Sequence, residues 1–147
     1  MTNENKRNGV GFFMGAIGLA LAVAGAVAVV VCSLVSADYA LSNLPLYLLG
    51  IACAICLEVA LRFVKLAGKA KTLVPFIARG VSVFLLARVS LDVITARILL
   101  ISGLFTWNSG NAVGWTVFSA TVVATALLLA SAVLLVIGAF VPEKKRA

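Results

Sequence analysis

Residues 75–105 read PFIARGVSVFLLARVSLDVITARILLISGLF, and this stretch decides the fold. It is long and apolar enough to cross a bilayer as a helix, for which about 20 residues suffice. The same run carries four ionisable side chains, Arg79, Arg88, Asp92 and Arg97. Each such group within the hydrocarbon costs roughly 2.5–3.5 kcal/mol on insertion scales, so the rest of the chain must provide something that satisfies it.

The composition places this stretch in a membrane protein. The chain has 147 residues, of which 63% are hydrophobic and 12% are charged. An average soluble domain is about 45–50% apolar and about 25% charged, so a soluble fold of this size has too little interior for so much apolar surface. We therefore expect an all-α polytopic membrane protein, a four-transmembrane-helix bundle that forms one compact unit.

Apolar runs divide the chain into four predicted spans and two polar tails. The spans are residues 9–36, 45–65, 75–105 and 113–141, and the tails are residues 1–8 and 142–147. The first run exceeds the region of about 7–15 residues in a secretory signal, which favours a retained span, although residues 35–37 also fit a cleavage tripeptide. Small residues four apart, Gly11 with Gly15 and Gly18 with Ala22, suit close helix packing inside the bundle or at a dimer seam.

Basic residues gather on one side of the four spans. Ten of the 12 Lys and Arg residues lie in the tails or around the loop between the second and third spans. These ten are Lys6, Arg7, Arg62, Lys65, Lys69, Lys71, Arg79, Lys144, Lys145 and Arg146. The positive-inside rule makes this side cytoplasmic, which predicts a multi-pass plasma-membrane protein with both termini inside. The net charge of +7 thus indicates topology and not nucleic-acid binding.

The two sides of the membrane also differ in what their loops can contact. Lys65, Lys69 and Lys71 lie in the basic loop, where we expect them to contact anionic lipid. The loop after the third span has no charge, and Trp107 and Trp115 bracket it in the manner of interfacial aromatic residues.

The third span carries polar groups on two faces. Arg88 and Asp92 are four residues apart, and Thr95 falls on the same helical face. Arg97 lies about 180° from Arg88 at 100° per residue, on the face of Ser90. We therefore expect this span to be central or to border a water-filled cavity. The Arg88–Asp92 pair is either a structural pair that fixes helix packing or part of a transport or ligand site.

A second candidate polar group lies nearer the basic loop. Glu58 precedes Arg62 by four residues, and Arg79 is at a similar depth in the next span. We expect Glu58 to pair with Arg79 or with Arg62. A lone membrane carboxylate can couple transport to protons, but pairing with a basic neighbour works against that role.

No residue pattern indicates catalysis, a metal or a cofactor. The chain has no His and three Cys, all within apolar runs. Cys53 and Cys56 form C-x-x-C, but without His or a second pair this spacing indicates two small core residues. We therefore expect no enzyme activity.

Residues 61–86 read LRFVKLAGKAKTLVPFIARGVSVFLL, the end of the second span, a basic loop and a Pro-Phe entry into the third. This arrangement resembles small four-span bacterial membrane proteins grouped as a domain of unknown function. The loop departs from that pattern, because it holds Lys and Ala where an Asn- or Ser-rich turn is common. The resemblance implies a small bacterial membrane protein of unassigned activity.

Two functions remain open from the sequence. The first is a non-enzymatic accessory or regulatory membrane protein that acts through helix contacts with a second copy or a partner protein. The alternative is a small transporter or channel that uses Glu58, Arg88, Asp92 and Arg97. A continuous polar cavity that reaches Arg88 would favour the alternative.

Overall fold

The protein is an all-α bundle, as the sequence predicts. The computed structural model describes the backbone of residues 2–141 and the side chains of residues 11 and 13–141. Its elements in order are α1 (Thr2–Leu34), the 3-10 turn η1 (Ala37–Tyr39), α2 (Leu44–Phe63), α3 (Ala70–Ala96), α4 (Ile98–Phe105) and α5 (Ala112–Phe140). Four of these helices, α1, α2, α3 and α5, are long and apolar enough to cross a membrane.

The helix bounds differ from the predicted spans in three places. The predicted third span is two helices, because α3 ends at Ala96 and α4 begins at Ile98. Pro75 does not open that span but lies inside α3, which begins at Ala70. At the N-terminus, α1 begins at Thr2, within the predicted polar tail. The basic C-terminal tail, residues 142–147, lies outside the described residues.

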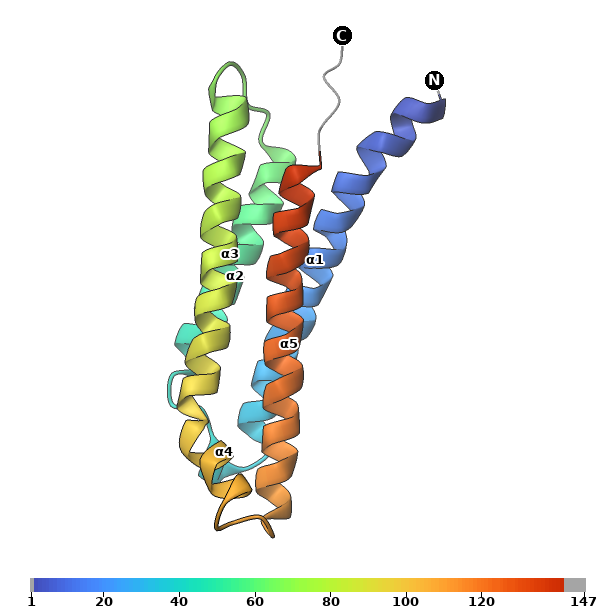
Figure 1. Ribbon diagram of the computed structural model, residues 1–147. Coiled ribbons are helices and arrows are strands. Elements are labelled where there is room, and N and C mark those ends of the chain that lie inside the picture. The colour runs from blue at the N-terminus through green and yellow to red at the C-terminus, as the bar shows by residue number, and fades with distance from the viewer. Residues whose placement is uncertain (1, 142–147) are drawn as a thin grey trace.

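The four long helices pack as two neighbouring pairs, α1 with α5 and α2 with α3 (Figure 1). The helix α1 packs along α5, and α3 packs against both α2 and α5. The loop between α2 and α3 lies at the same end of the bundle as the start of α1 and the end of α5, whereas α4 lies at the opposite end. The basic loop and the uncharged loop are therefore at opposite ends, as the four-span prediction requires.

Small residues bring α1 and α5 together. A Cβ added at Gly18 would lie 3.2 Å from Leu135 Cδ2, and one added at Gly25 would lie 2.7 Å from Leu128 Cδ2. The Ser131 hydroxyl of α5 donates a 2.6 Å hydrogen bond to the Gly18 carbonyl. Because lipid tails are as apolar as leucine, close packing and such hydrogen bonds are what hold membrane helices together. Gly18 therefore serves packing within the bundle, one of the two uses open from the sequence.

The outside of the bundle is apolar over most of its length. Large side chains such as Phe13, Val27, Phe84, Leu99 and Val133 are exposed. On a soluble protein a surface of this kind would be a liability to aggregation. On helices of this length it is the surface expected to face lipid.

Candidate functional site

The helix α3 has two polar faces, as predicted from its periodicity. Ser90 is fully buried and faces the neighbouring helices. Its hydroxyl donates to the Leu86 carbonyl, which satisfies it within the helix. Arg88 and Thr95 are exposed on the opposite face. The distribution of buried and exposed residues thus confirms the predicted faces.

An ion pair lies on the exposed face of α3. Arg88 Nε donates to Asp92 Oδ2 at 3.1 Å, and the two side chains are 64% and 33% exposed. Thr95 on the same face uses its hydroxyl to donate to the Leu91 carbonyl. The expectation that α3 would be central or border a water-filled cavity does not hold for this face, because the buried residues of α3 lie on the opposite face, toward α2 and α5. The charges are thus left on the outside of the bundle.

The depth of this pair follows from the helix beside it. A Cβ added at Gly50 of α2 would lie 3.0 Å from Val89, the residue after Arg88. Gly50 is six residues inside α2, about 9 Å from its end at 1.5 Å per residue. With 20 residues, α2 is about 30 Å long, equal to the hydrocarbon thickness of a bilayer. Arg88 therefore lies beside the interior of this span, and Asp92, one turn further along α3, lies nearer its end.

Arg97 occupies the break between α3 and α4. It is only 4% exposed. Its Nη2 donates to the Cys32 carbonyl at 3.2 Å and to Cys32 Sγ at 3.5 Å. Cys32 is two residues before the end of α1, where backbone carbonyls lack helical partners and the helix dipole is negative. Arg97 therefore stabilises the end of α1, although its Nε has no hydrogen-bond partner among the described atoms.

A second charged cluster joins α1, α2 and α3. Glu58 is 2% exposed, and its Oε2 lies 3.6 Å from Arg79 Nε. This contact confirms the predicted pairing across the two helices. A Cβ added at Gly15 would lie 2.7 Å from Arg62 Nη2, so the Arg62 side chain reaches α1. Glu58 Oε1 and Arg79 Nε are buried without a hydrogen bond in the described structure, which leaves the cluster only partly satisfied.

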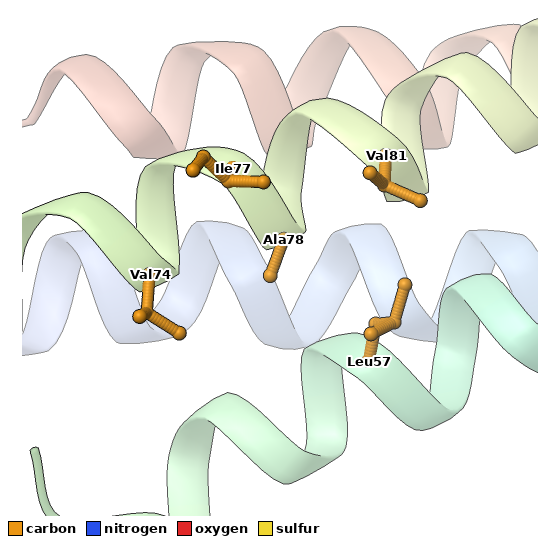
Figure 2. A pocket seen from close by; sticks show the side chains of 5 residues that line it. All are labelled: Leu57, Val74, Ile77, Ala78 and Val81. Atoms are coloured by element: carbon orange, nitrogen blue, oxygen red, sulfur yellow. The ribbon is translucent and has the colours of Figure 1, made fainter. Parts of the chain in front are cut away.

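A groove of about 260 Å³ separates α2 from α3 beside this cluster. Its lining is apolar throughout and consists of Leu57, Val74, Ile77, Ala78 and Val81. Figure 2 shows Leu57 on α2 opposite the four α3 residues. A groove with this lining suits a hydrocarbon chain and offers an ion or a polar solute no ligand.

The cysteines do not lie where the sequence suggested. Cys53 and Cys56 are exposed, so their interpretation as core residues is wrong. The inward stripe of α2 contains Tyr47, Ile51 and Ala54, and the two cysteines fall beside it. The buried cysteine is Cys32. Among the described residues, no group of three or more His, Cys, Asp and Glu residues could hold a metal ion.

Several polar contacts between helices have no clear signal in the sequence. Cys32 Sγ lies 3.0 Å from Thr121 Oγ1 of α5, beside the contact with Arg97. The Asn111 amide donates to the Tyr39 hydroxyl at 2.7 Å and ties η1 to the start of α5. Ser and Thr are common in membrane helices, so only the packed structure identifies which of them have partners.

Among the described residues, the charged groups of the predicted spans thus lie at three separate sites: an exposed pair on α3, a buried Arg97 and a buried cluster around Glu58. No protein-family model, curated protein or solved structure matches the chain. The function must therefore be argued from the geometry of these three sites.

Proposed function

We propose that this chain is a non-enzymatic accessory or regulatory protein of the plasma membrane, and that it works through helix contacts on the outer face of α3. The observation that carries the proposal is the Arg88–Asp92 pair, 3.1 Å apart and exposed on α3 within the length that α2 spans. Lipid tails offer these groups no hydrogen bonds. A second protein helix offers them partners and removes them from hydrocarbon, where each costs roughly 2.5–3.5 kcal/mol.

The transporter alternative has its own support in the unpartnered buried atoms Glu58 Oε1 and Arg97 Nε. Transport needs a polar path to such atoms. The groove beside Glu58 is lined by apolar side chains. The Arg88–Asp92 pair lies on the outside of the bundle and not in a cavity lining. The geometry therefore supports helix contacts better than transport.

Photo-crosslinking in native membranes tests this function. A photoreactive amino acid at Leu91, an exposed residue between Arg88 and Asp92, should give a discrete protein adduct. Replacing both charged residues by Leu should remove that adduct and leave the bundle folded, because the pair is on its outside. The same probe at Val133, exposed on α5, serves as the control position. Adducts with lipid alone at both positions would refute the proposal.

We further propose that both termini are cytoplasmic and that the lysine loop contacts anionic lipid in a bacterial plasma membrane. The exposed Lys65 and Lys69 of the loop and Lys71 in the first turn of α3 support this, since each basic residue near an anionic surface contributes about 1 kcal/mol. The resemblance of residues 61–86 supports the bacterial origin.

Replacing these three lysines by Gln should weaken binding to phosphatidylglycerol by up to about a hundredfold, or about 3 kcal/mol. Native mass spectrometry of the purified protein with phosphatidylglycerol or phosphatidylcholine measures this, and the three-Arg variant is the charge-matched control.

A reporter at the C-terminus that is active only outside the cytoplasm should stay silent in the wild type. Unchanged lipid binding in the Gln variant would argue against the lipid contact, and an active reporter would argue against the orientation.

A further inference from the structure

We infer that the outer face of α3 docks a second copy of this chain about a two-fold axis normal to the membrane. This inference rests on the proposed function and names its partner. The helix α3 lies at the edge of the bundle, where another copy can approach it (Figure 1). Four observations on the exposed pair and its surroundings support a copy over other occupants.

First, the pair retains unused hydrogen-bonding capacity. Arg88 reaches Asp92 through Nε, and the acceptor is Oδ2. Within the described part of the chain, Arg88 Nη1 and Nη2 and Asp92 Oδ1 make no hydrogen bond. A guanidinium group can donate five hydrogen bonds and a carboxylate can accept about four, so each pair can bind a second pair without giving up its own contact.

Second, the two charges are placed for a two-fold axis. Residues four apart are offset by about 40° around a helix, so Arg88 and Asp92 lie side by side as well as one above the other. Their 3.1 Å contact keeps the charged groups at nearly one depth. A two-fold axis normal to the bilayer preserves depth and exchanges left for right. It therefore sets Arg88 opposite Asp92 of the partner subunit, and Asp92 opposite the partner's Arg88.

Third, a small exposed residue lies beside this face. Gly80 lies eight residues before Arg88, about 12 Å along α3 and about 80° around it. A Cβ added at Gly80 would have no atom of the chain within 4 Å, so nothing inside the bundle calls for glycine there. Small residues at such positions let the backbones of two membrane helices approach closely.

Fourth, a second copy carries the complementary acid and base by symmetry, so the partner needs no further property. A different partner would have to present an acid and a base at matching depth and in the matching lateral order. A second copy presents both by construction, and two-fold dimers are the commonest oligomers of identical chains. The four charges would form a closed ring away from lipid.

Charge reversal in separate chains tests the inference. All chains carry Thr95→Cys as the disulfide reporter on the same face, and Cys53→Ala and Cys56→Ala remove the exposed thiols. The reporter chain with the native pair should crosslink to itself in membranes. Arg88→Asp and Asp92→Arg should each lower self-crosslinking at least about tenfold, because like charges then face each other across the axis. Co-expressing the two reversed chains with different tags should restore crosslinking between them.

A swapped chain that carries both Arg88→Asp and Asp92→Arg is the control for misfolding of the single variants. It keeps a neutral pair, so it should crosslink to itself but not to the reporter chain with the native pair, where like charges would meet. Protection of the buried Cys32 from maleimide reports the fold of every variant. Failure of the native-pair chain to crosslink, or free mixing of swapped and native-pair chains, would overturn the dimer.

The two proposals fail differently. A pair-dependent adduct at Leu91 with another protein, together with no crosslink between copies, would overturn the dimer and leave the proposed function in place. An absence of any protein adduct on this face would overturn both.

Discussion

Replacing Glu58 by Gln should lower the free energy of unfolding of the bundle by about 3 kcal/mol, the low end of the range for breaking a buried ion pair. The change keeps the shape of the side chain and removes the charge that faces Arg79 at 3.6 Å. Arg79 would then lie within the bundle without that carboxylate. The low end of the range applies because the Arg79 side chain is 30% exposed and can turn partly outward.

Unfolding of the purified protein in increasing denaturing detergent measures this effect. Asp92→Asn is the matched control, since it makes the same carboxylate-to-amide change in a pair on the outside of the bundle, and it should cost less than Glu58→Gln because the 64% exposed Arg88 side chain can turn toward headgroups or water. Leu at both position 58 and position 79 should recover much of the loss, because neither member of the ion pair is then left buried without the other. Equal costs for Glu58→Gln and Asp92→Asn would show that burial of Glu58 contributes little.

Replacing Gly25 by Leu should destabilise the bundle by about 3 kcal/mol relative to the same change at Gly80, the high end of the range for overpacking. Even the first added atom at Gly25 would lie 2.7 Å from Leu128 Cδ2, 2.9 Å from Cγ and 3.4 Å from the backbone nitrogen of that residue. The flexible end of Leu128 can turn aside, but the backbone of α5 cannot do so without separating from α1.

Gly80→Leu is the matched control, because a Cβ there meets no atom of the chain within 4 Å. Both variants gain a similar helix propensity over glycine, so their difference in unfolding free energy isolates the packing contribution. In the dimer inferred above, Gly80→Leu should instead weaken crosslinking between copies. A Gly25 variant as stable as the Gly80 variant would mean that α1 and α5 tolerate separation.

The periodicity of residues 75–105 predicted which side chains of α3 share a face, because spacing along the sequence determines angle around a helix. It could not predict which face is inside. Because of their charge, Arg88 and Asp92 were expected to lie on a central helix or beside a water-filled cavity. The buried face of α3 consists instead of Ser82, Leu86, Val89, Ser90 and Val93. Which face of α3 is buried depends on the packing of whole helices, and no short sequence pattern indicates it.

The same limit explains Arg97 and the cysteines. Nothing near Arg97 in the sequence indicates that its partner is the Cys32 carbonyl, 65 residues earlier. Glu58 and Arg79, by contrast, belong to helices joined by a short loop. Their similar distance from that loop was enough to predict the contact. Contacts between charged residues could be predicted for helices joined by a short loop. They could not be predicted for helices that are distant in the sequence.

The pairing of α1 with α5 has a consequence for how the chain assembles during its synthesis. Of the four long helices, α1 is synthesised first and α5 last, yet each is the other's main packing partner, and Ser131 donates to the Gly18 carbonyl 113 residues earlier. Until α5 is inserted, the glycines of α1 that α5 covers must face lipid or another protein. The packing of these four helices is therefore incomplete until α5 has entered the membrane.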